Sequence, residues 1–357
     1  PRRGSADYWA LMVLAAVLGG GEDSPLHEEL VKRSRLALSA SAHMPYWSSH
    51  YNSRGCDLFG LFVTPRVDAD LGAVSAGLDK VLARLLKEGP TEEELSRAKI
   101  QLERSWLEGQ QSLGDRAQTL SSYAALVGDP SDFPRDFRLL LKTGRADVRR
   151  AARRWLGSRG RVVLEVVPGS PVAAAVEPAA EEPPDSPPRG PSAAAPASGP
   201  VRPLSLPHLS RFRLSNGLDV LLVRDARLPL VEARLALPAG RAHELSGEDG
   251  LSPACEELML KGCEGQDAAA VARAFTGLGW AVGTASEAEW LKFSASGLAR
   301  TFDAFCAQLA RVMTAAVYPE EEVSLWRENA VEELAMRRTQ PSFLAEERLR
   351  LELFPGH

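Results

Sequence analysis

The chain has 357 residues, of which 45% are hydrophobic and 25% charged, and its formal net charge is −5. This length allows two domains with a core each, and the composition excludes a disordered or fibrous protein. The mild negative charge gives no reason to expect a nucleic-acid partner. The four cysteines form no Cys-x-x-Cys pair and are too sparse for a disulfide framework, so we interpret them as small buried side chains.

The first 168 residues predict one α+β unit. Its expected elements, in chain order, are a buried helix over 6–19, a short helix over 24–35, strands over 36–43 and 56–64, helices over 68–88, 91–109, 114–127 and 147–156, and a closing strand over 161–167. Thr91, followed by Glu94 three residues later, predicts a capping box. The apolar run 8–18 is too short for a membrane span, which needs about 20 residues.

Residues 169–207 divide the chain. They are rich in Pro and Ala and poor in large apolar residues, which predicts a semi-extended linker. The pattern then restarts over 208–357 with a hairpin around Asn216-Gly217. Further expected elements are a strand over 230–237, helices over 250–261 and 267–278, two strands within 281–297, and helices over 300–316, 319–339 and 342–353. Antiparallel hairpins followed by runs of helices predict an α+β fold, with antiparallel-rich sheets packed by helices.

One stretch of the second half has the pattern of a metal-binding helix. Gly250 to Cys263 read Gly-Leu-Ser-Pro-Ala-Cys-Glu-Glu-Leu-Met-Leu-Lys-Gly-Cys. This stretch resembles the zinc helix of the insulinase/pitrilysin family of metallopeptidases, Gly-Leu-Ala-His-x-x-Glu-His-Met, where both His bind zinc and the Glu is the general base. The first His position is Pro253 and the second is Glu257. Only Glu256, at the base position, keeps its residue type, so we interpret it as the remnant of a catalytic position.

The resemblance extends to both halves. Residues 208–357 are similar to the family's N-terminal domain, from Leu-Ser-Asn-Gly-Leu-Asp-Val at Leu214 to the helix that supplies a third zinc ligand. Residues 1–168 are similar to its C-terminal domain, with Leu-Gly-Gly-Gly-Glu-Asp-Ser at Leu18 and Arg-Val-Val-Leu-Glu-Val-Val-Pro-Gly at Arg161. This order indicates the middle of a tandem bacterial member, with two processing-peptidase-like domains and further domains on either side.

The resemblance implies a degenerate metal site. The third ligand position falls on Glu333, with Glu332 as the alternative. The residue types themselves indicate that Pro253 lies in the first turn of a helix, with Ser252 as its N-cap. Three interpretations stay open: a helix kept for packing, a carboxylate site for a metal other than zinc, and residual zinc activity. We expect no metal in this segment, and zinc only where an intact motif lies in a preceding part. His243 is interpreted as a solvated loop residue, and no ligand spacing joins the other histidines His27, His43, His50 and His208.

Arg116 and Tyr123 are a second candidate site. In the family, an Arg and a Tyr seven residues apart bind the substrate backbone and stabilise the oxyanion. Two helical turns separate these positions, which places both side chains on one helix face. Surface and packing roles are the alternative.

Two functions follow from the resemblance. The first is part of a zinc metalloendopeptidase, a hydrolase of peptides, in which this segment supplies a non-catalytic chamber wall. The alternative is a wholly non-catalytic scaffold, or a partner subunit of an active paralogue. The implied partners are a peptide substrate of the assembly and the other half of the fused protein or a paralogous subunit. The bacterial compartment, periplasmic or cytoplasmic, is left open.

Overall fold

The computed structural model describes residues 1–46, 55–157, 160–167, 207–245, 247–248 and 250–354. They fall into two compact units, one made of residues 1–161 and 228–357 and the other of residues 162–227. The helices of the first unit are α1 (Ala6–Gly19), α2 (Pro25–His27), α3 (Leu71–Glu88), α4 (Glu92–Glu108), α5 (Leu113–Ser122), α6 (Phe133–Lys142), α7 (Arg145–Trp155), α8 (Leu251–Leu258), α9 (Ala268–Gly277), α10 (Phe302–Thr314), α11 (Glu320–Arg337) and α12 (Pro341–Leu353). Short irregular helices are η1 (Glu28–Arg33), η2 (Tyr123–Val127), η3 (Pro130–Asp132), η4 (Arg241–His243) and η5 (Ala299–Thr301).

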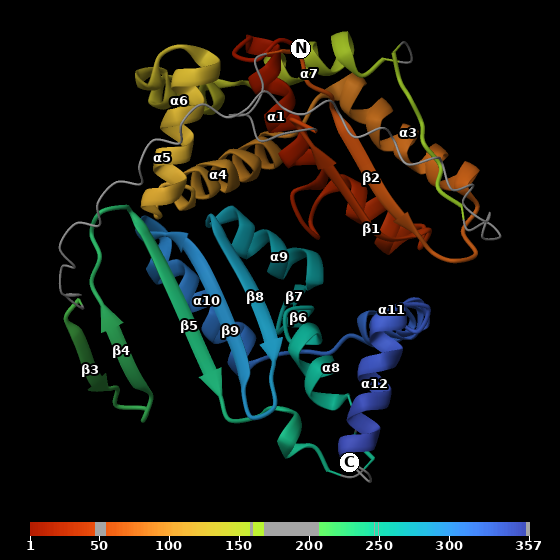
Figure 1. Cartoon of the computed structure of the whole chain (residues 1–357), viewed down its shortest axis with the longest axis vertical. Coiled ribbons are helices and arrows are strands. Elements are labelled where there is room, and N and C mark those ends of the chain that lie inside the picture. Colours follow the sequence, from red (N-terminus) through yellow and green to blue (C-terminus); the bar gives the residue numbers. More distant parts are fainter. Residues whose placement is uncertain (47–54, 158–159, 168–206, 246, 249, 355–357) are drawn as a thin grey trace, which may run out of the picture. The chain divides into compact units, whose positions relative to one another are not determined.

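Helix α1 is the centre of the core formed by the first 161 residues. Its sequence is apolar on every face, which suits a helix surrounded by protein, and its side chains are buried from Asp7 to Ala15. It packs against α4, α7 and strand β1 (Ala37–His43), as Figure 1 shows. Strand β1 pairs antiparallel with β2 (Gly60–Pro65), so that Ala40 lies opposite Val63. These elements confirm the α+β interpretation of this part.

The predicted capping box at the start of α4 is present. Thr91 Oγ1 accepts the amide N–H of Glu94 at 3.1 Å, and a Glu94 carboxylate oxygen accepts the amide N–H of Thr91 at 2.7 Å. The reciprocal bonds satisfy two amide groups that have no partner within the helix. The predicted helix start is therefore correct to the residue.

The second part of the first unit has a three-stranded antiparallel sheet. Its strands are β5 (Leu230–Leu237), β9 (Leu291–Leu298) and β8 (Trp280–Ser286), in that order, and α9 and α10 contribute to the core beside it (Figure 1). The rings of Trp280 and Phe305 stack with centroids 3.8 Å apart. A side chain at Gly297 would collide with the Trp280 ring, so glycine is required there. A small ladder joins β6 (Gly262–Cys263) to β7 (Gln266–Asp267).

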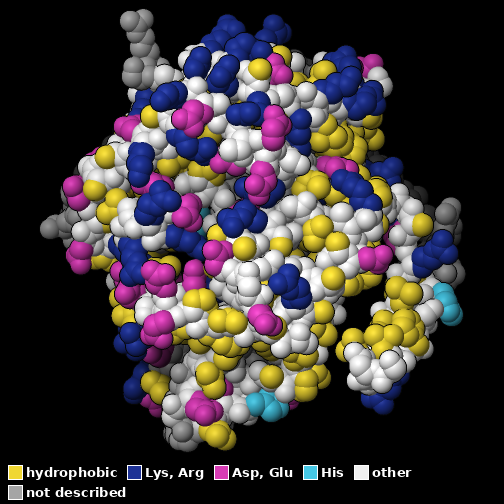
Figure 2. Space-filling model, turned by 180° about the vertical axis from the view of Figure 1, so that it is seen from behind, with side chains coloured by type: hydrophobic (Ala, Val, Ile, Leu, Met, Phe, Trp, Pro, Cys, Tyr) yellow, Lys and Arg dark blue, Asp and Glu magenta, His cyan; other side chains and the backbone are white. Residues whose placement is uncertain are grey.

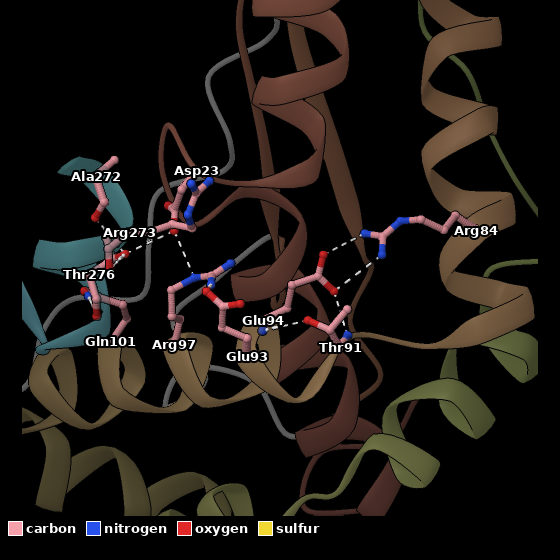
Figure 3. A network of polar contacts seen from close by, with 10 residues as sticks. All are labelled: Asp23, Arg84, Thr91, Glu93, Glu94, Arg97, Gln101, Ala272, Arg273 and Thr276. Atoms are coloured by element: carbon pink, nitrogen blue, oxygen red, sulfur yellow. Dashed lines mark hydrogen bonds and ion pairs between the residues drawn. The ribbon is translucent and has the colours of Figure 1, made fainter. Parts of the chain in front are cut away.

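Helix α4 connects the two parts of this unit through polar contacts (Figure 3). Arg97 Nε lies 3.0 Å from Asp23 Oδ2, and the same oxygen accepts the hydroxyl of Thr276 at 3.1 Å. Gln101 Nε2 donates to the backbone carbonyl of Thr276 at 2.7 Å. Arg97 and Gln101 are four residues apart and lie on one face of α4. Farther along the helix, Glu108 Oε1 accepts the hydroxyl of Ser296 at 2.6 Å.

The second unit contains the predicted hairpin. Strands β3 (Leu209–Arg213) and β4 (Asp219–Val223) pair antiparallel around the Asn216-Gly217 turn. Gly217 has a φ of 89°, which glycine adopts without steric cost. Leu221 is 64% exposed. Two strands alone are marginally stable in water, so this unit presents apolar side chains with little core of its own.

Three sequence predictions are corrected by the structure. The closing strand over 161–167 is absent: these residues have no regular secondary structure and pair with no strand among the described residues, and strand structure requires a hydrogen-bonded neighbour. The strand expected over 56–64 begins only at Gly60. Helix α6 was not predicted, although Pro134 near its start and the spacing of Phe133, Phe137 and Leu140 are typical of an amphipathic helix. The linker over 169–207 lies almost wholly outside the described residues, and the predicted domain boundaries stay a prediction.

Candidate functional site

The N-terminus of α8 is held by a carboxylate from the preceding loop. Glu244 Oε1 accepts the amide N–H of Ser252 at 2.6 Å, and Glu244 Oε2 accepts that of Gly250 at 3.3 Å. These backbone bonds hold the pKa of Glu244 below its ordinary value. The helix starts at Leu251 with Gly250 as its cap, so the expectation that Ser252 is the N-cap was wrong. Pro253 does lie in the first turn, as predicted, where its missing N–H leaves no bond unmade.

At the two α8 positions where the resemblance predicts zinc ligands, one side chain cannot bind a metal and the other has a different hydrogen-bond partner. Pro253 has no ligand atom in its side chain. Glu257, at the second His position, accepts a hydrogen bond from Trp326 Nε1 at 3.0 Å on its Oε2. This bond joins α8 to α11. Glu256, at the base position, is half-buried on α8.

The two candidates for the third ligand point to different partners. Glu333 is exposed and forms an ion pair with Arg337 one turn later, at 2.6 Å. Glu332 Oε1 accepts a bond from Arg66 Nη1 at 2.9 Å, at the end of β2. Trp326 and Glu333 are seven residues apart and therefore share a face of α11. That face includes the contact with α8, which favours Glu333 over Glu332 as the counterpart of the family ligand.

These residues do not fit a zinc site. Zinc in peptidases requires three protein ligands, two of them imidazoles on one helix, with an open fourth position. Among the residues that the structure describes, no group of three His, Cys, Asp or Glu side chains could hold a metal ion. Two carboxylates with separate partners offer only oxygen atoms, which zinc accepts poorly without nitrogen or sulfur.

The described histidines belong to different elements of the chain. His243 is exposed in η4, as expected for a loop residue, and His208 is exposed next to β3. His43 is hydrogen-bonded to Ser41 Oγ at 3.1 Å. Burial of His27 in α2 lowers its pKa. His50 lies outside the described residues.

Arg116 and Tyr123 have different environments. Arg116 is exposed on α5, whereas Tyr123 begins η2 and is 1% exposed. The Tyr123 hydroxyl donates to Asp136 Oδ2 at 3.0 Å, and the Arg3 guanidinium lies over its ring at 4.9 Å. A buried, hydrogen-bonded tyrosine has a packing role as the structure stands. The substrate role of this pair stays a prediction.

Sequence reasoning missed Glu244, Trp326 and Asp136. The role of Glu244 as a cap across a loop depends on tertiary geometry, which no local pattern specifies. The Asp136 partner of Tyr123 follows from α6, whose apolar spacing was present in the sequence and not used.

Comparison with known families identifies the first part of the chain. Residues 1–102 match the family model described as the peptidase M16 inactive domain. Residues 1–102 are therefore assigned to the M16 inactive-domain family. M16 is the insulinase/pitrilysin family, so the resemblance deduced from the sequence is confirmed over this range. In this M16 domain lie α1, the β1–β2 ladder and most of α4.

Several solved structures are similar to the chain at low sequence identity. The peptidase M16 inactive domain from Pseudomonas fluorescens is 21% identical with a TM-score of 0.40, covering 42% of this chain and 37% of the other. A protease from Helicobacter pylori is 25% identical with a TM-score of 0.38, covering 44% and 36%. The periplasmic protease PqqL from Escherichia coli is 13% identical with a TM-score of 0.31, covering 97% and 39%. These scores are too low to assign a function.

The match spans little more than a third of the length of the first two solved structures. No curated protein matches the chain. Among the described helices, none is long and apolar enough to cross a membrane. Figure 2 shows Lys and Arg side chains interspersed with Asp and Glu on the face turned away from Figure 1.

Proposed function

We propose that this chain is part of an insulinase-family zinc metalloendopeptidase and supplies a non-catalytic wall of its peptide-binding chamber. The M16 inactive domain over residues 1–102 supports the family role. One observation supports the non-catalytic role above all. The second zinc-ligand position, Glu257, is hydrogen-bonded to Trp326, and the first is Pro253. Helix α8 is thus retained as a packing element.

The chemistry of α8 supports this view because the general base has nothing to act on. In a zinc peptidase the base removes a proton from a metal-bound water whose pKa the metal has lowered. Glu256 keeps the carboxylate, but its neighbours on α8 provide no imidazole. A carboxylate without the metal leaves water at its ordinary pKa, far too high for attack at neutral pH.

The alternative proposal is a scaffold or partner subunit without any active site of its own in the longer protein. The two proposals differ in one feature, an intact His-x-x-Glu-His in another domain of the same polypeptide. In the first proposal Arg116 and Tyr123 would meet a peptide bound at that other centre. In the second they would be packing and surface residues.

The experiment compares the full-length protein with two variants. Cleavage of an internally quenched peptide is measured for the unaltered protein, for Glu256→Gln, and for the corresponding change in any intact motif found elsewhere. We expect Glu256→Gln to leave cleavage unchanged and the other change to abolish it. A loss of activity with Glu256→Gln would contradict the non-catalytic role, and a full-length protein that cleaves no peptide would support the scaffold.

The chain itself provides a second test. Metal analysis after purification without chelators should find far less than one zinc per chain, and a chelator should not change any residual peptide cleavage. Stoichiometric zinc in the unaltered chain would overturn the interpretation of α8.

A further inference from the structure

A cavity of about 470 Å³ lies among α1, α4, α5, η2 and α6. Its walls come from residues that are far apart in the sequence, from Trp9 on α1 to Leu140 on α6. Its lining consists of Trp9, Met12, Leu102, Ser105, Trp106, Gly109, Gln110, Asp115, Gln118, Thr119, Tyr123, Phe133, Asp136, Phe137 and Leu140. A volume in this range suits a small organic molecule.

Aromatic rings form much of the wall. Trp106 on α4 stacks on Phe137 of α6, with centroids 4.2 Å apart and planes 13° from parallel. Trp106 also stacks on Phe133, with ring centroids 4.9 Å apart and planes 18° from parallel. Tyr123 meets Phe133 edge to face at 5.4 Å. These rings make this side of the cavity largely apolar.

The charges in the lining are all of one sign. Asp136 and Asp115 line the cavity, and no Lys, Arg or His is among the lining residues. Asp136 is 5% exposed, and burial raises its pKa against the lowering effects of Tyr123, Arg135 and Arg3. A buried carboxylate beside aromatic rings favours a positively charged neighbour.

The Asp136 carboxylate has capacity for a further donor. Its Oδ2 accepts the Tyr123 hydroxyl, and its Oδ1 lies 3.7 Å from Arg135 Nη2, beyond hydrogen-bonding distance. An ionised carboxylate accepts about four hydrogen bonds. An ammonium group brings three donors and a positive charge to the remaining lone pairs of this carboxylate, in addition to the ion pair with Arg135. A neutral ligand adds no charge, and an anionic ligand would meet a like charge.

We propose that this cavity binds a small apolar amine, with the ammonium group at Asp136 and the hydrocarbon body against Trp106, Phe133 and Phe137. The site lies within residues 1–161 and uses none of the residues of α8, although Tyr123 in its lining is also one of the two residues proposed above to meet a peptide. The amine is defined by its chemistry: one positive charge on an aromatic or branched aliphatic body of a size that fits the cavity.

Three matched probes test the proposal on the purified chain. They are 2-phenylethylamine, the neutral 2-phenylethanol and the anionic 3-phenylpropionate, and isothermal titration calorimetry measures their binding at pH 7.5. We expect the amine to bind at least about tenfold more tightly than the alcohol, the gain that a charge-assisted hydrogen bond gives. The carboxylate should bind most weakly.

Two variants assign the effect to Asp136. In Asp136→Asn the amide can still accept the Tyr123 hydroxyl, but the charge is gone, so the preference for the amine over the alcohol should disappear. Asp132→Asn is the matched control: this carboxylate, 2.8 Å from Arg135, does not line the cavity, and its removal should leave the preference intact. Circular dichroism confirms that both variants are folded.

Each adverse result overturns the proposal. Equal binding of amine and alcohol would show an apolar cavity without selectivity for charge. No binding of any probe would show that the cavity takes no ligand of this size. A preference that survives in Asp136→Asn, or is lost in Asp132→Asn, would place the charge recognition elsewhere. The comparison of the three probes on the unaltered chain decides the charge preference even if Asp136→Asn fails to fold.

Discussion

Trp326 on α11 donates its indole N–H to Glu257 on α8, at 3.0 Å. The resemblance of the sequence to the insulinase family predicts that this acceptor occupies the position of the second zinc-binding histidine. The helix that resembles a zinc helix is therefore joined to the helix that would supply the third ligand, but by a tryptophan and a carboxylate instead of by a metal. The alignment of α8 and α11 can be tested by introducing histidines at the two predicted ligand positions of α8.

The double change Pro253→His and Glu257→His should create a zinc site. The two imidazoles would be four residues apart on one face of α8, and Glu333 would face them from α11. We expect about one zinc ion per chain by metal analysis, and a tetrahedral cobalt spectrum on substitution. The further change Glu333→Gln should abolish binding, whereas Glu332→Gln, whose carboxylate contacts Arg66, should not. The opposite pattern would show that Glu332 is the counterpart.

Glu244 should determine whether the first turn of α8 is ordered. In Glu244→Ala the amides of Gly250 and Ser252 lose their acceptor. We expect faster hydrogen exchange at both amides and fraying of the helix start. Glu248→Ala is the control, because its carboxylate bonds the amide of Leu245 instead. Unchanged exchange at Ser252 in the first variant would remove the capping role.

The hydrogen bonds from the start of α8 to Glu244 should be lost as the pH falls. The folded-state pKa of Glu244 is lowered, so its stabilising effect is present above the unfolded-state pKa. It is lost as the pH falls through the folded-state pKa. Exchange protection at Ser252 should therefore decline on acidification in the unaltered chain, and Glu244→Ala should lack this decline.

The ion pair between Arg97 on α4 and Asp23 should contribute strongly to the free energy of unfolding. Both side chains are largely buried, 14% and 8% exposed, so Asp23→Ala removes the buried partner of the guanidinium and leaves only the exposed Glu93. We expect a loss of about 3 kcal/mol in the free energy of unfolding, measured by urea denaturation. Glu93 is the matched control, because it pairs with the same arginine but is 73% exposed. Its change to Ala should cost less than about 1 kcal/mol; equal losses would contradict the role of burial.

Asp136 should make the fold less stable as the pH rises. Its pKa is raised in the folded state, so the folded chain binds the proton more tightly than the unfolded chain does. The stability of the unaltered chain relative to Asp136→Asn should fall as the pH rises from about the unfolded-state pKa through the folded-state pKa, and be constant above it. The groups facing the carboxyl are Tyr123, Arg135, Arg3 and Asp132. Urea denaturation from about pH 3.5 to 8, a range that includes the titration of carboxyl groups, measures the difference. A difference that grows with pH would contradict the prediction.

Much of the local structure follows from short-range patterns. The Thr91 capping box fixed the start of α4, the alternation in 230–237 gave β5, and Asn216-Gly217 placed the hairpin turn. Each of these signals depends only on neighbouring residues. The strand expected over 161–167 is absent. Its apolar residues match a strand, but a strand also requires a hydrogen-bonded partner, which the local sequence does not specify.

The sequence by itself determined the family of the first part, the α+β class and the loss of both imidazoles from α8. These are matters of residue identity and order. Only the tertiary structure decided that Trp326 bonds Glu257, that Glu244 caps α8, and that Tyr123 is buried against Asp136. Such contacts join residues whose separation in the chain ranges from 8 to 69 positions, and the packing of whole helices sets their distances.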